Sequence, residues 1–241
     1  MNARPLALLV AVVSGGCATV ALAQGELVTY SWRFVEVVAG TNTPVASPNG
    51  MLQPGEAARL TLDVSFTPPV GSTVTYNPPP PPGVGTVAGL SEVFFNLLGD
   101  TSAQGTWSFH QRAPGFSIGM QGTELPGGKG RENASAAQFV LPGQTANALN
   151  PFPALWSMVW TPASYSPRSV TWQSAPGSSA PTSHSSLLIQ YGTTAQGEPQ
   201  YVGKFVAGQF GSVIVPIVPA PGVGVVALGG AAWLSRRRRG R

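Results

Sequence analysis

Alternation of apolar and polar residues at every second position is the pattern that most constrains the fold of this chain. It is clearest from Arg59 to Phe66, where the apolar positions are Leu60, Leu62, Val64 and Phe66. Successive side chains of a β-strand point to opposite faces, so these four would share one face. Residues 28–34 alternate in the same way. The pattern predicts strands that bury one face.

With further candidates, nine predicted strands lie between stretches rich in turn-forming residues. They are 28–34, 59–66, 106–110, 137–141, 155–160, 169–173, 187–191, 200–206 and 209–215. The chain has 30 Gly and 24 Pro, and five prolines are consecutive at positions 78–82. We therefore predict an all-β fold, a single β-sandwich domain with long Pro/Gly-rich loops. An N-terminal signal helix and a short C-terminal hydrophobic helix would flank this domain.

Local features refine this prediction. The last three segments predict a meander with a tight turn at Ala207-Gly208. Residues 91–98 begin with a capping serine and end before Gly99, which predicts a short helix, with a strand as the alternative. The glycines of 121–131 predict a flexible surface loop, and Asn133-Ala134-Ser135, a glycosylation sequon by pattern, is expected in an ordinary loop.

The charge of the chain is concentrated at its ends. Arg4 and five C-terminal arginines account for six of the 13 basic residues. The body, residues 24–217, keeps seven basic and nine acidic side chains and contains no cluster of Lys and Arg, so we expect no nucleic-acid partner. Cys17 is the only cysteine. Because it would leave with a signal peptide, the mature body is expected to form no disulfide.

The N-terminus has the three parts of a secretory signal. Arg4 supplies the positive charge, residues 6–13 are apolar, and Ala21-Leu22-Ala23 matches the Ala-x-Ala pattern of a cleavage site. These residues predict a signal peptide over 1–23, removed by signal peptidase to leave Gln24 first. A lipoprotein signal, with Cys17 as the lipidated residue, is the alternative.

The C-terminus, residues 218–241, also has three parts. Val218-Pro219-Ala220-Pro221 is followed by an apolar segment, residues 222–234, and then by an arginine cluster. The cluster consists of Arg236, Arg237, Arg238, Arg239 and Arg241. As a helix the apolar segment would be about 20 Å long, shorter than a stable membrane span, and a buried core helix is the alternative. Arginines beside an apolar segment stay in the cytoplasm, which would leave residues 24–217 outside.

This three-part tail resembles the PEP-CTERM sorting signal of bacterial exported proteins, in the Val-Pro-Ala-Pro form common in planctomycete proteins. Ala220 stands where the family has Glu. The resemblance covers about a tenth of the chain. It implies recognition by an exosortase-type membrane protease near Val218 to Pro221, a membrane partner for the apolar segment, and a location in the cell envelope or outside the cell.

The residues of the body give little indication of chemistry. His110 and His184 are the only histidines, no Gly-x-Ser-x-Gly motif is present, and we expect no cofactor, no metal and no catalytic activity. Trp156 and Trp160 would share one strand face. We predict that they pack in the core, with an exposed sugar-stacking face as the alternative. The sequence therefore favours a non-enzymatic surface or extracellular-matrix protein, with a carbohydrate-binding or adhesion module, one that takes extracellular polysaccharide, as the alternative.

Overall fold

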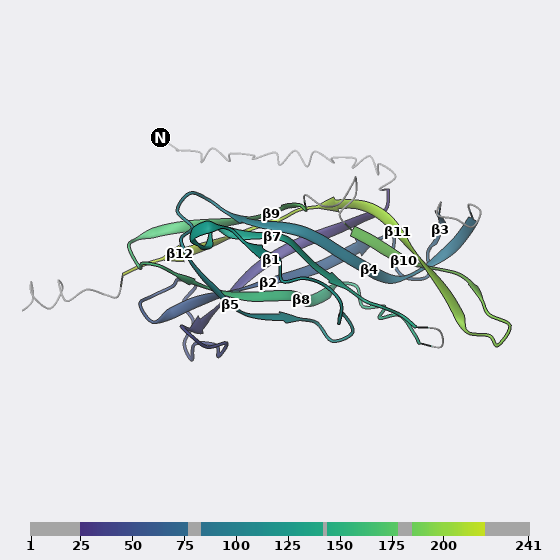
Figure 1. Cartoon of the computed structure of the whole chain (residues 1–241), viewed down its shortest axis with the longest axis horizontal. Helices are drawn as coiled ribbons and strands as arrows, with labels where there is room; N and C mark the ends of the chain where they lie inside the picture. The colour runs from purple at the N-terminus through teal and green to yellow at the C-terminus, as the bar shows by residue number, and fades with distance from the viewer. Residues whose placement is uncertain (1–24, 77–82, 142–143, 178–184, 220–241) are drawn as a thin grey trace, which may run out of the picture.

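The computed structural model describes residues 25–76, 83–141, 144–177 and 185–219, and this part of the chain is all β (Figure 1). It contains no α-helix, and its one 3-10 turn is η1 (Pro126–Gly128). The strands are β1 (Leu27–Val38), β2 (Glu56–Thr67), β3 (Thr73–Tyr76), β4 (Gly83–Gly99), β5 (Gly105–Arg112), β6 (Thr123–Glu124), β7 (Gly130–Ala137), β8 (Phe152–Pro162), β9 (Arg168–Pro176), β10 (Ser185–Thr193), β11 (Pro199–Gln209) and β12 (Ser212–Ile217). The all-β prediction is confirmed.

Hydrogen bonding joins these strands into one mixed sheet. Its order is β12-β9-β4-β10-β11-β1-β2-β8-β5, with β3 and β7 added along β4 and β6 beside β7. All the strand pairs are antiparallel except β1 with β11, which run parallel for three residues from Leu27. This short parallel pair connects two wings. One wing contains β1, β2, β8 and β5, and the other contains β11, β10, β4, β9 and β12.

Aromatic side chains of the two wings contact each other across the interior. Phe95 of β4 lies 5.5 Å from Trp32 of β1 and 5.4 Å from Trp156 of β8, measured between ring centroids. Trp172 of β9 lies 5.1 Å from Trp160 of β8. These edge-on contacts are the geometry that aromatic rings prefer. The predicted apolar faces of 28–34 and 59–66 point into this core, with most of their side chains fully buried.

The predicted helix at residues 91–98 is wrong. These residues belong to β4, the longest strand, where Val93, Phe95 and Leu97 are completely buried. Pairing overrides the local capping pattern here, since this half of β4 pairs with β7 and β9 on its two sides. The alternative that the sequence left open, a strand, is the one observed.

Residues 121–141 also differ from prediction. The strand expected at 137–141 is not observed, because β7 ends at Ala137, where the predicted strand would begin. The expected flexible loop contains β6, η1 and the start of β7. The sequon lies inside β7 rather than in a loop. Ala134 is fully buried, and the backbone N–H of Asn133 donates a 2.8 Å hydrogen bond to the side chain of Asn96. The small residues of β7 did not resemble a strand because they lack bulky apolar side chains.

The predicted meander stops after its first hairpin. β10 and β11 pair as expected, but Ala207 and Gly208 continue β11 and pair with β1. The chain turns at Phe210-Gly211 instead, and β12 crosses to β9 at the far edge of the sheet. This crossing places the C-terminal strand at a sheet edge.

Candidate functional site

The described chain leaves the sheet where the tail motif begins. β12 ends at Ile217, and the Val218 N–H donates a 2.9 Å hydrogen bond to the carbonyl oxygen of Leu52. Pro219 is exposed and makes no backbone hydrogen bond across the sheet. Ala220, Pro221 and the arginine cluster lie outside the described residues. No helix within the described ranges is long and apolar enough to cross a membrane.

The predicted cleavage site at Ala21, Ala23 and Gln24 also lies outside the described residues. The first contacts within the described residues come shortly after it. The Lys204 ammonium forms an ion pair with the Glu26 carboxylate and donates a hydrogen bond to the backbone oxygen of Thr75. Leu27 then begins β1. The described body therefore starts within a few residues of the predicted cleavage position.

Trp156 and Trp160 are in the core. Both have an exposed fraction of 0%, as does Trp172. An unexposed ring cannot stack on a sugar. The prediction that both side chains pack in the core is confirmed, and the alternative, a sugar-stacking face at these two positions, is excluded.

Tyrosines gather instead around the β10–β11 hairpin, where Tyr191 is exposed and Tyr76 and Tyr201 are half-buried. Tyr201 of β11 lines two hollows, of about 310 and 260 Å³. Tyr191 of β10 lines the second hollow, and Tyr76 of β3 lies 5.9 Å from it between ring centroids. We call these two hollows, with Tyr76, Tyr191 and Tyr201, the tyrosine groove. Three of the five tyrosines of the chain thus lie together.

The register of four neighbouring strands places polar side chains in one row beside these rings. Thr73 of β3 pairs with Thr86 of β4, Thr86 with Gln190 of β10, and Gln190 with Tyr201 of β11. Directly paired residues of antiparallel strands point to the same face. A β-bulge leaves Tyr191 out of register between Gln190 and Gly192. Bulges redirect side chains and are frequent beside functional sites.

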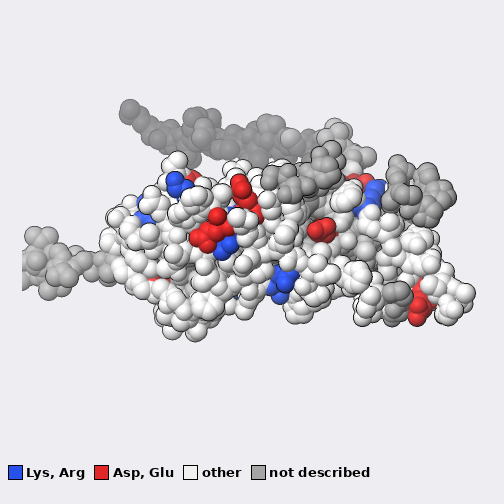
Figure 2. Space-filling model, viewed as in Figure 1, with Lys and Arg blue, Asp and Glu red and all other residues white. Residues whose placement is uncertain are grey.

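The lining of the tyrosine groove is uncharged. Its polar side chains are threonines and glutamines, namely Thr86, Thr145, Gln190, Thr194 and Gln200. No Asp, Glu, Lys or Arg is among the described residues that line either hollow. The surface as a whole is also poor in charge, and the face in Figure 2 shows a few scattered charged residues.

His110 of β5 faces Trp156. A bulge at Phe109, with φ +51°, breaks the alternation, so that Phe109 is exposed and the His110 ring lies 5.4 Å from Trp156. Burial, with the positive charges of Arg112 and Arg131, lowers the pKa of His110. Its Nε2 atom is buried without a hydrogen-bond partner in the described structure. These contacts indicate a neutral, packed histidine.

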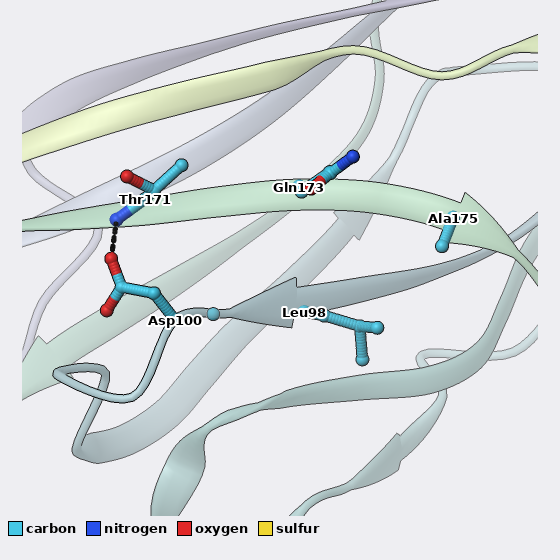
Figure 3. A pocket seen from close by; sticks show the side chains of 6 residues that line it. Leu98, Asp100, Thr171, Gln173 and Ala175 are labelled. Carbon is cyan, nitrogen blue, oxygen red and sulfur yellow. Dashed lines mark hydrogen bonds between the residues drawn. The ribbon is translucent and has the colours of Figure 1, made fainter.

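A third hollow, of about 280 Å³, lies beside β4 and β9 at Asp100 (Figure 3). The Asp100 carboxylate accepts hydrogen bonds from the Thr171 N–H (2.6 Å), the Ser102 N–H (2.8 Å) and the Ser102 hydroxyl (2.5 Å). Burial alone would raise the pKa of Asp100, but these hydrogen bonds outweigh it and hold the pKa below its usual range. The Asp100 carboxylate therefore stabilises the turn between β4 and β5 through its hydrogen bonds.

Glu36 is a buried acid whose carboxylate is also hydrogen-bonded to the backbone. The Glu36 carboxylate, 2% exposed, accepts hydrogen bonds from the N–H groups of Asn49, Gly50 and Met51. No group of three or more His, Cys, Asp and Glu residues that could hold a metal ion occurs in the described part of the chain. His184 lies outside it.

No protein-family model matches the sequence, and no curated protein matches it significantly. The function of the protein is therefore inferred from its own geometry and sequence. Of the sites considered, the sequence pointed to the tail and to Trp156 and Trp160, and it missed the tyrosine groove. Tyr191 and Tyr201 lie on the two strands of one hairpin, but Tyr76 is more than a hundred residues away along the chain, and only strand pairing brings it beside them.

Proposed function

We propose that this protein is an exported, non-enzymatic component of the cell surface or extracellular matrix, sorted and anchored through residues 218–241. Signal peptidase would remove residues 1–23. The apolar segment would hold the chain in the membrane, with the arginines on the cytoplasmic side, until an exosortase-type protease processes it near the Pro motif. The body would then act outside the cell as a β-sandwich whose layers are the two wings of the sheet.

One observation carries this proposal: the tail motif begins where strand pairing ends. β12 is complete at Ile217, and the last described hydrogen bond to the body is that of Val218. A protease needs several residues of extended, accessible chain, which are absent inside a paired strand. Cleavage beyond the exposed Pro219 would leave every described strand intact. The body is therefore suited to release from the membrane without unfolding.

We propose a non-enzymatic role because the titratable side chains of Asp100, Glu36 and His110 already have contacts within the protein. Asp100 and Glu36 are committed to backbone N–H groups, and His110 is packed against Trp156. General acid–base catalysis needs titratable groups free to reach a substrate. The described hollows bring together no such set.

The experiment is to follow processing in the native bacterium with a Pro219→Ala/Pro221→Ala variant and a variant with the five tail arginines changed to Gln. The first should accumulate as an unprocessed membrane form, and the second should lose stable orientation in the membrane. Pro167→Ala, an exposed loop proline outside the tail, is the matched control and should be processed normally. Normal processing of both tail variants would refute the proposed sorting role.

A further inference from the structure

The tyrosine groove has the composition of a ligand site. Its two hollows total a volume in the range of roughly 300–1,000 Å³ that small-ligand sites have. Partly exposed tyrosines supply apolar ring faces and hydroxyl groups at low entropic cost, since each has few rotatable bonds. The bulge at Tyr191 redirects its side chain into this region. Tyr191 is exposed and lies outside the core cluster, whereas Tyr76 is half-buried and also packs against the core.

We propose that the tyrosine groove binds a neutral glycan chain. The polar side chains that line it are hydroxyls and amides, which both donate and accept hydrogen bonds. A sugar offers hydroxyl groups that do the same, together with C–H faces that pack on aromatic rings. No lining residue is cationic, so nothing in the described groove would compensate the charge of a phosphate, sulfate or uronate.

The row Thr73, Thr86, Gln190 and Tyr201 favours an extended ligand. Neighbouring strands lie about 4.8 Å apart, so a row across four strands is about 14 Å long. The row crosses the strands and leads to the two hollows that Tyr201 joins. A single small molecule would occupy one hollow, whereas a chain fits the row and both hollows.

A proline-rich peptide is the other ligand that aromatic grooves bind. Its backbone offers carbonyl acceptors but few donors, because proline has no N–H. Such a peptide would leave acceptor atoms of the groove without donors. These atoms are the side-chain amide oxygens of Gln190 and Gln200 and the oxygens of the threonine hydroxyls. The polar lining therefore favours the glycan.

The position of the groove suits an extracellular ligand. Figure 1 shows β3, β10 and β11 at one end of the elongated body, and the C-terminal end of β12 at the opposite end. If the tail holds the protein at the membrane, the groove is directed away from it. The groove itself does not depend on how the tail is processed, so the two proposals can fail separately.

The test is affinity electrophoresis of the purified full-length protein in gels containing hydroxyethylcellulose, xyloglucan, galactomannan, soluble β-1,3-glucan or, as the anionic comparison, alginate. At least one neutral polysaccharide should retard the protein, and alginate should not. Tyr191→Ala and Tyr201→Ala should each weaken that binding about tenfold. Thr86→Val, which removes one hydroxyl with little change of shape, should weaken it by a smaller factor.

Phe205→Ala is the matched control, because Phe205 is 67% exposed on β11 but lines neither hollow. It should leave binding unchanged, and thermal unfolding of each variant confirms that it folds. The proposal is overturned if no neutral polysaccharide binds, if alginate alone binds, or if the tyrosine variants bind normally. It is also overturned if a decaproline peptide binds in a Tyr191-dependent way and displaces the polysaccharide.

Discussion

Aromatic residues gather at two places in this molecule, and the two differ in what surrounds them. In the core, Trp156, Trp160 and Trp172 have no exposed surface and contact aromatic rings of the opposite wing. At the β10–β11 end, Tyr191 is 38% exposed and lies among hydroxyl and amide groups. The tryptophans are therefore committed to the fold, whereas the exposed ring of Tyr191 is accessible to a ligand.

The largest expected effect of this difference is on stability. Trp160→Ala should lower the free energy of unfolding by about 3–5 kcal/mol, because it removes a fully buried ring and leaves a cavity against Trp172. Urea unfolding followed by circular dichroism measures the change. A loss below about 1 kcal/mol would mean that the two wings do not pack as described.

Replacing a glycine by alanine in each region tests how closely that region is packed. A Cβ atom at Gly99 would lie 2.3 Å from the Cβ of Ala103 and 2.8 Å from the Trp172 ring. Gly99→Ala should therefore lower the free energy of unfolding by about 1–3 kcal/mol. A Cβ atom at Gly192, near the groove, would meet only the Gln200 Oε1 atom at 3.4 Å. Gly192→Ala should change stability by less than about 0.5 kcal/mol, and equal costs in the same urea assay would contradict the comparison.

The pH dependence of stability tests whether His110 is packed against the core. Its pKa is lowered in the folded protein, so the unfolded chain binds a proton more readily. Its contribution to stability is therefore complete above the unfolded pKa of about 6.5 and is lost as pH falls from there through the lowered folded pKa. The difference in unfolding free energy between wild type and His110→Phe, measured from pH 8 to pH 4, should follow this course. A difference that does not vary with pH would show that His110 is solvated.

Loss of the exposed tyrosine of the groove should also have little effect on stability. Tyr191→Ala removes a side chain that is partly exposed and unpaired in the ladder, so its cost should stay below about 1 kcal/mol. Differential scanning calorimetry of Tyr191→Ala and Trp160→Ala compares the stability that each variant loses. A cost as large as that of Trp160→Ala would make Tyr191 a structural residue and remove the contrast between the two regions.

Strands with strong alternation could be predicted from the sequence, and strands defined by pairing could not. The segment 59–66 lies within β2, and its four apolar residues are buried as expected. The bulge at Phe109 has no local signal, because a positive φ at a non-glycine residue is set by its surroundings. The parallel pair of β1 with β11 joins segments almost at opposite ends of the body, which no local pattern records.

The same limit applies to the candidate sites. A tail motif is contiguous, so its residues can be identified by reading along the chain. The tyrosine groove depends on the register that aligns Thr86, Gln190 and Tyr201 across three strands. Its one local signal is Tyr191 followed directly by Gly192 near the hairpin, which is too common a pattern to identify a site.

The most direct test of the central claim is the intact mass of the protein recovered from the native cell envelope and from the medium. A chain that begins at Gln24 and ends near Pro219 to Pro221 is the predicted result, because both end segments would have been processed around an intact sheet. A recovered chain that retains residues 236–241 would contradict the sorting account and make the tail a permanent membrane anchor.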